Sequence, residues 1–199
     1  MNLASLFGFL GTVLGLVRAL PQLVRLLRAH EAYGVSVDTS ATSAIVSFGW
    51  AVYGLLTDQP YVSLATGSSG LIFTAITFFA LRYGRRAREF KIAPLWLGVV
   101  LLTGLITGKA GLGILLPLSV LAANLPQLWV AFKESSLADL SLGTWLLSMA
   151  DGLVWGGYAL SQGDIPILIY AVLQLVTSGL IVAARCLRKT KSLSPKGLN

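Results

Sequence analysis

The stretch Leu20-Pro21-Gln22-Leu23 returns as Leu125-Pro126-Gln127-Leu128, which is 105 residues further along the chain. At that offset, segment 20–55 matches segment 125–160 without gaps at 10 of its 36 positions. The other six identities pair Ser36 with Ser141, Thr39 with Thr144, Ser43 with Ser148, Trp50 with Trp155, Tyr53 with Tyr158 and Leu55 with Leu160. Chance matching in a leucine-rich chain does not explain shared Pro, Gln, Trp and Tyr. The sequence therefore predicts an internal repeat, and a repeat sets the architecture.

The composition is that of a membrane protein. The 199 residues are 55% hydrophobic and 12% charged, with a mean hydropathy of +0.78, whereas soluble domains are about 25% charged. Apolar segments of membrane-spanning length are expected at 3–27, 40–57, 61–82, 92–109, 112–132, 141–161 and 165–186. We interpret the first as a span, because no basic segment precedes it as in a signal peptide. The chain is expected to be disordered from Arg185 onward.

The basic residues indicate the orientation. With seven spans, 13 of the 15 fall on one side, and only Lys109 lies opposite, with Arg18 inside the first span. The positive-inside rule places that side in the cytoplasm and the N-terminus outside. This distribution favours an integral protein of the cell (plasma or inner) membrane. It argues against nucleic-acid binding, which the net charge of +7 would otherwise suggest.

The repeat comprises spans 1–3 and 5–7. Three spans are an odd number, so the fourth span restores the direction and makes the two halves parallel. They then face each other across an axis along the membrane normal, and sites in such proteins lie between the halves. The expected fold is an all-α membrane protein of seven helices, arranged 3+1+3.

The Pro-Gln pairs late in spans 1 and 5, the segments 36–39 and 141–144 that open spans 2 and 6, and this layout resemble the PQ-loop family. That family includes the SWEET and SemiSWEET sugar transporters, cystinosin-like amino-acid exporters and the KDEL receptors. The resemblance implies a first three-helix bundle at 1–88, a linker helix at 89–110, a second bundle at 111–187 and a basic cytoplasmic tail at 188–199. It also implies hinges at Pro21 and Pro126.

Proline inside a helix removes a backbone hydrogen bond and kinks the helix. Equivalent kinks at Pro21 and Pro126 are expected to act as a hinge pair, although a fixed kink is the simpler interpretation. Gln22 and Gln127 are expected to bond the freed carbonyls or to line the pathway. The spacings Gly11–Gly15, Gly104–Gly108 and Gly152–Gly156 predict close helix packing.

One helix face of span 6 carries a stripe spaced i, i+3, i+7 and i+10: Ser148, Asp151, Trp155 and Tyr158. Trp50 and Trp155 occupy matching positions, and we expect them to form an aromatic clamp for a solute. A tryptophan at this place is similar to the sugar-stacking residue of SWEET-like proteins. The alternative is an interfacial aromatic belt, which suits Tyr53 and Tyr158 better.

SWEET-type proteins usually place an asparagine on span 3 and its counterpart on span 7 to bond the sugar, and this chain has none there. Thr66, Ser69 and Gln174 are the candidate replacements, because their side chains donate and accept hydrogen bonds. Asn124 breaks the symmetry of the repeat, since its counterpart is Ala19. It is expected to line the path or to cap the kinked backbone.

Arg18 and Asp151 are ionisable residues inside predicted spans, where such residues are rare and indicate function. We expect either a gating ion pair between the halves or a proton-coupling role for Asp151. The simpler interpretation is that Arg18 extends to the surface, which is hard because side chains lean toward the N-terminus of their helix.

No metal, cofactor or catalytic motif is visible, and His30 is the only histidine, so an enzyme is not expected. The expected function is transport of a small polar solute, a sugar ahead of an amino acid, by alternating access. The alternatives are a proton-coupled cystinosin-like carrier and a non-transporting receptor like the KDEL receptors. The expected partners are the solute and the lipid bilayer, and the chain is a monomer or a homo-oligomer.

Overall fold

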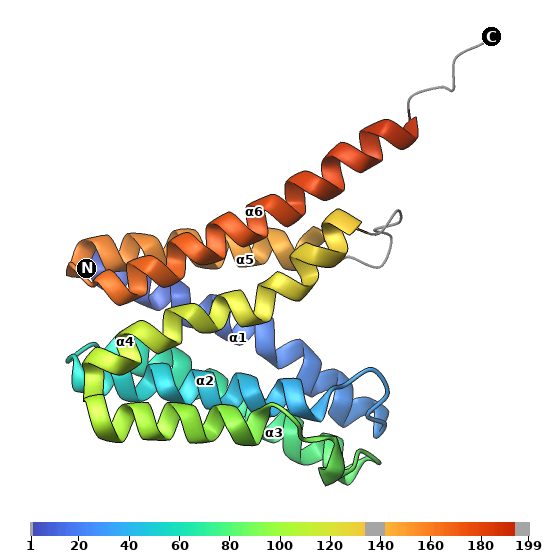
Figure 1. Cartoon of the computed structure of the whole chain (residues 1–199), viewed down its shortest axis with the longest axis horizontal. Helices are drawn as coiled ribbons and strands as arrows, with labels where there is room; N and C mark the ends of the chain where they lie inside the picture. Colours follow the sequence, from blue (N-terminus) through green and yellow to red (C-terminus); the bar gives the residue numbers. More distant parts are fainter. Residues whose placement is uncertain (1, 134–141, 194–199) are drawn as a thin grey trace.

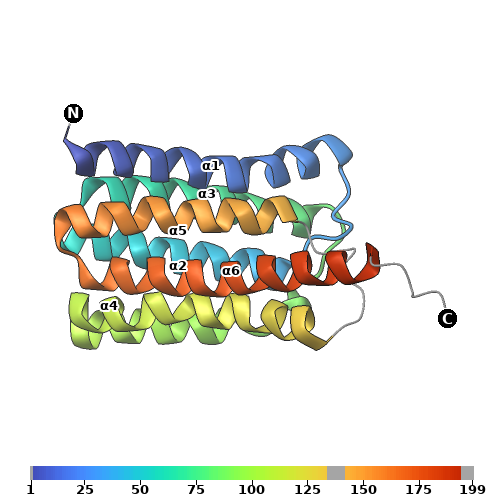
Figure 2. The ribbon, with the colours of Figure 1, turned by 90° about the horizontal axis from the view of Figure 1, so that it is seen from above.

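The computed structural model describes residues 2–133 and 142–193. Its helices are α1 (Leu3–Ala29), α2 (Val37–Leu56), α3 (Pro60–Arg82), a short 3-10 helix η1 (Ala87–Glu89), α4 (Ala93–Lys133), α5 (Leu142–Gln162) and α6 (Ile165–Leu193). Figure 1 shows them as long, roughly parallel rods, which Figure 2 shows from above. Five of these helices within the described residues are long and apolar enough to cross a membrane: α1, α2, α3, α4 and α6.

α4 is two helices joined by a sharp reversal. Gly108 has a φ of +59° and a ψ of −142° inside it, a conformation that a residue with a Cβ rarely adopts. Figure 1 shows the chain turning back there, so α4 has a first limb (93–107) and a second limb (109–133). The described residues thus form seven long helical segments, which confirms the predicted all-α membrane fold. Our expectation that Gly108 serves helix packing is wrong, since its surroundings are open.

The basic segments gather at one end of the bundle. The C-terminal ends of α1, α3, α4 and α6 lie together on the right of Figure 1, and the N-terminus lies at the opposite end. We call these the basic end and the N-terminal end. α6 continues to Leu193, so the prediction of disorder is wrong for residues 185–193. Residues 194–199 of the predicted tail lie outside the described residues.

The helices form two groups of three. α1 and α2 pack on α3, and the second limb of α4 joins α5 in packing on α6. We call α1–α3 the first group, and the second limb with α5 and α6 the second group. The groups meet where α1 packs on α5 and α2 packs on α4. Each contact joins the first helix of one group to the second helix of the other, as expected for two parallel repeats.

Asp38 attaches the first limb of α4 to α2. Its carboxylate accepts backbone N–H bonds from Lys91 at 2.9 Å, Ile92 at 3.0 Å and Ala93 at 2.9 Å. Lys91 and Ile92 directly precede α4 and Ala93 is its first residue, where helix N–H groups have no partner within the helix. A side chain of α2 therefore caps the linker helix.

Replacing Asp38 with alanine is expected to lower the melting temperature of the detergent-solubilised protein by about 3–6 °C. Bonds to a charged acceptor contribute at least about 1.5 kcal/mol, and 1 kcal/mol corresponds to about 2–4 °C at this chain length. Thermal unfolding measures the change. Glu31→Ala, on an exposed loop residue, is the control that should leave the temperature unchanged, and an equal fall in both would contradict the capping role.

Candidate functional site

The two groups interlock through glycines near the N-terminal end. A Cβ on Gly11 of α1 would lie 2.7 Å from the Trp155 ring of α5, and a Cβ on Gly157 would lie 2.6 Å from Phe7. Across the other contact, a Cβ on Gly49 would lie 2.8 Å from a methyl group of Leu116. Helices that approach this closely exclude solvent from the interface. Of the three predicted glycine pairs, Gly11–Gly15 and Gly152–Gly156 do lie in packed interfaces.

A substitution at Gly11 tests this interface. Gly11→Ala is expected to separate α1 from α5, because any Cβ closer than 3 Å to the rigid indole forces a shift. We expect a lower melting temperature and slower solute uptake. Gly98→Ala is the matched control, since a Cβ there meets nothing within 4 Å. Equal tolerance of the two alanines would contradict the close approach.

Hydrogen bonds between the groups close the N-terminal end. The Tyr53 hydroxyl donates to Asp164 Oδ2 at 2.8 Å, and the Gln59 side-chain amide donates to the same oxygen. Asp164 Oδ1 accepts the backbone N–H of Ile167 at 2.8 Å and so caps α6. Gln59 and Asp164 are 105 residues apart. Gln59 directly precedes α3, and Asp164 directly precedes α6. Our sequence analysis missed both, although their separation equals the repeat offset.

An ion pair joins the groups midway along the bundle. Arg18 Nη1 of α1 lies 3.2 Å from Asp151 Oδ2 of α5. The Asp151 side chain is 3% exposed and the Arg18 side chain 37%. Tyr170 of α6 donates to the same carboxylate oxygen at 2.7 Å, and its ring meets Trp50 of α2 edge-on, with centroids 5.6 Å apart. The two charges expected to pair therefore do so, within a network that connects four helices.

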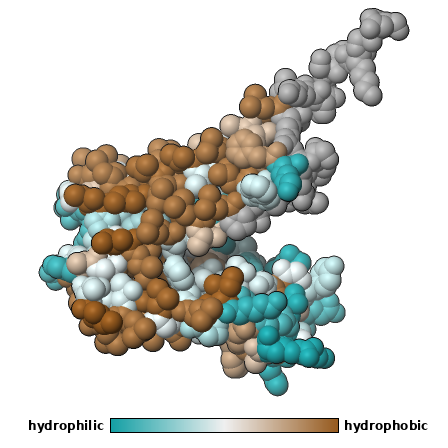
Figure 3. Space-filling model, in the orientation of Figure 1, coloured by the Kyte–Doolittle hydropathy of each residue, from teal (hydrophilic) through white to brown (hydrophobic). Residues whose placement is uncertain are grey.

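Toward the basic end the groups separate. One apolar core contains residues of both groups, such as Trp50, Tyr53, Trp155 and Tyr158. The two cores nearer the basic end each belong to one group. The core of the first group contains Leu26 and Ile76, and that of the second group contains Trp145 and Ile181. Figure 3 shows the resulting cleft, which opens on the side where the hydrophilic residues gather. The structure is closed at the N-terminal end and open at the basic end.

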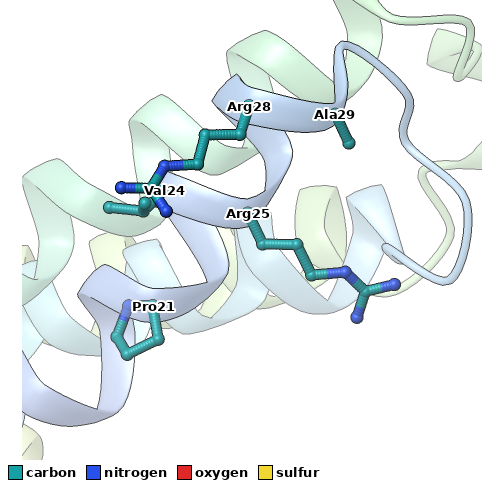
Figure 4. Close-up of a pocket in the computed structure, with 5 residues that line it drawn as sticks. All are labelled: Pro21, Val24, Arg25, Arg28 and Ala29. Atoms are coloured by element: carbon teal, nitrogen blue, oxygen red, sulfur yellow. The ribbon is translucent and has the colours of Figure 1, made fainter.

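A hollow of about 540 Å³ lies beside the C-terminal part of α1, toward the basic end. Its lining residues are Pro21, Val24, Arg25, Arg28 and Ala29. Figure 4 shows the Arg25 side chain reaching away from the helix and that of Arg28 folding back over Val24. The hollow therefore combines an apolar floor with two guanidinium groups.

Both predicted clamp tryptophans are 7% exposed and lie in the shared core. Their described ring contacts are with tyrosines: Trp50 meets Tyr53 edge-on at 5.5 Å, and Trp155 meets Tyr158 edge-on at 5.4 Å. Tyr53 and Tyr158 are themselves 4% and 2% exposed. The interpretation of these tyrosines as an interfacial belt is therefore wrong, because such residues face lipid.

The other predicted binding residues have partners within the protein. Asn124 Nδ2 donates to Gln174 Oε1 at 3.2 Å and to Thr177 Oγ1 at 2.8 Å, so it joins α4 to α6 inside the second group. The hydroxyl of Thr66 donates to the Val62 carbonyl, and that of Ser69 to the Ala65 carbonyl. Ser69 and Gln174 occupy matching positions of the repeat, on the central helix of each group.

The predicted hinge residues are only partly described. Pro21 lies inside α1, which continues through it. Gln22 is exposed. The backbone of Pro126 and Gln127 belongs to α4, but their side chains lie outside the described part of the chain. Ser141 of the predicted segment that opens span 6 also lies outside it.

The overall arrangement is similar to that of a solved eukaryotic SWEET transporter. The TM-score is 0.73 at 15% sequence identity, and the alignment covers 95% of this chain and 100% of that chain. At this identity the likeness shows the fold. No family model matches the sequence, and neither does any curated protein.

Proposed function

We propose that the chain is a membrane transporter that moves a small polar solute by alternating access. One observation carries the proposal: contacts between the two groups extend from the N-terminal end as far as the Arg18–Asp151 pair, and beyond it the apolar cores separate. A central site sealed from one end and open to the other is what a carrier needs in one of its two states. The positive-inside rule makes the basic end cytoplasmic, and the state inward-facing.

In this proposal Trp50, Trp155, Tyr170 and the Arg18–Asp151 pair surround the solute pathway. The contacts of Asp164 with Tyr53 and Gln59 form the gate that must break for the site to open outward. Pro21 and Pro126 supply the flexible points in the first helix of each group. Thr66, Ser69, Asn124 and Gln174 position these helices, and we propose that they reach the solute only after the helices move.

Uptake into proteoliposomes by the full chain tests the proposal. A panel of labelled sugars and amino acids is offered with and without an imposed pH gradient. Flux of a sugar without the gradient supports a facilitative carrier like the SWEET transporter. Flux that requires the gradient supports a proton-coupled carrier in which Asp151 carries the proton. Saturable binding of a ligand with no flux of any solute would overturn the transporter and favour a receptor of the same fold.

A further inference from the structure

One face of α1 runs from the ion pair to the basic end. Phe7, Gly11, Arg18 and Arg25 lie at intervals of four and seven residues, which places them on one helix face. α5 covers this face at Phe7 and Gly11, and Asp151 covers it at Arg18. From Pro21 to Ala29 the helix lines the hollow. Arg18 lies one turn before Pro21, so this face of α1 leads from the hollow to the ion pair.

The group that this face presents to a solute is a cation. Asp151 is buried and already accepts bonds from both Arg18 and Tyr170. Arg18 contacts Asp151 through Nη1 and also interacts with Tyr170, and its side chain is 37% exposed. A guanidinium has five N–H donors in a planar fork that matches a carboxylate, so a partly exposed Arg18 has donors left for a ligand.

The approach to Arg18 is cationic as well. Arg25 and Arg28 line the hollow, and none of its five lining residues is acidic. Arginines at a cytoplasmic helix end are ordinary in membrane proteins, which accounts for Arg25 and Arg28 but not for Arg18. Seven residues of helix place Arg18 roughly 10 Å deeper than Arg25. Arg18 is therefore farther than Arg25 from the headgroup region at this end, which favours a soluble ligand.

We propose that the transported solute carries a carboxylate, which Arg25 and Arg28 attract and Arg18 binds in competition with Asp151. The inference rests on the proposed transporter function and narrows its substrate to amino acids and sugar acids. A neutral sugar can accept hydrogen bonds from the guanidinium, but it has no negative charge with which to replace Asp151. When the solute takes over Arg18, the bond between α1 and α5 is lost, which couples binding to movement of the two groups.

Binding by the full chain in phosphatidylcholine nanodiscs tests the substrate class without requiring flux. The probes are matched pairs that differ by one carboxylate, glucuronate with glucose and alanine with alaninamide, at constant ionic strength, and the readout is the rise in melting temperature, because a ligand that binds the folded state stabilises it. We expect the carboxylate member of at least one pair to bind about ten-fold more tightly, which corresponds to one bidentate contact. Equal or tighter binding of both members that lack the carboxylate would overturn the proposal.

Variants locate the binding group. Arg25→Gln is expected to weaken carboxylate binding about three-fold or more and to reduce its salt sensitivity, whereas Arg88→Gln, an exposed arginine of η1, should change neither. The double variant Arg18→Gln/Asp151→Asn avoids an unpaired buried charge. It should lose the preference for the probes that carry a carboxylate. Retention of that preference would contradict the assignment.

Two further outcomes distinguish a soluble ligand from a lipid headgroup, and ligand binding from transport. Loss of the carboxylate preference in nanodiscs that contain phosphatidylglycerol would mean that a lipid headgroup occupies the cations, and it would overturn the soluble ligand. Carboxylate binding without flux of any solute would overturn the transporter and leave the anion site intact.

Discussion

Trp155→Ala is expected to lower the initial rate of solute uptake about ten-fold or more, while the protein still inserts in the membrane. The indole is buried against Gly11 and beside Tyr158, at the place where α1 and α5 seal the pathway. Loss of one aromatic contact of about 1.4 kcal/mol is a ten-fold change, and the cavity left behind adds to it. Uptake into proteoliposomes, normalised to inserted protein, measures the effect.

Two controls accompany this experiment. Trp155→Phe keeps an aromatic ring and should retain a substantial part of the rate. Trp129→Ala removes an indole that is 66% exposed and should leave the rate unchanged. Normal uptake by Trp155→Ala would remove the tryptophan from the pathway.

Neutralising either member of the central ion pair is expected to impair the protein, and the two losses should differ in size. Asp151 is 3% exposed and Arg18 37%, so Arg18→Gln strands a buried carboxylate, at a cost of about 3–5 kcal/mol. Asp151→Asn leaves a guanidinium that solvent in the cleft still reaches. Thermal unfolding in detergent should therefore rank Arg18→Gln as the less stable variant.

Exchange of the two charges completes the test. The double variant Arg18→Asp/Asp151→Arg should recover the stability that each neutralised variant loses, because the pair is restored across the same two helices. Failure of the exchange, together with equal losses in both single variants, would argue against a direct interaction.

The pH dependence of uptake addresses the second role considered for Asp151. If this carboxylate carries a proton during transport, Asp151→Asn should flatten the dependence of uptake on an imposed pH gradient. An unchanged profile would discard proton coupling and leave Asp151 as the counter-ion of Arg18.

Much of the fold could be predicted because its signals are local. Apolar length located the seven helical segments, and the observed helices begin and end within a few residues of the predicted spans, apart from α6, which extends to Leu193. The exact repeat of Leu20-Pro21-Gln22 identified the two halves, and the fourth span between them predicted that the halves are parallel. The role of Gly108 was not predictable from spacing, because a turn and a packing glycine have the same sequence signature.

The site was only partly predictable. Arg18 and Asp151 could be paired from sequence because isolated charges inside apolar spans need a partner. Tyr170 could not be assigned, since its repeat counterpart is Ala65 and nothing local marks a tyrosine as the donor to a carboxylate on another helix. Gln174 was a candidate to bond the solute, and Asn124 was expected to line the path or to cap the kinked backbone. In the structure the Asn124 amide donates to Gln174 between α4 and α6, a contact that no local pattern predicts.

Locking the N-terminal end during transport tests the account most directly. Gln59→Cys and Asp164→Cys, in a Cys186→Ser background, are joined by a short thiol-specific cross-linker, and uptake of the transported solute is followed before and after reduction. The account predicts that the open double variant transports, that cross-linking stops uptake, and that a reducing agent restores it. Undiminished uptake by fully cross-linked protein would contradict alternating access through this end.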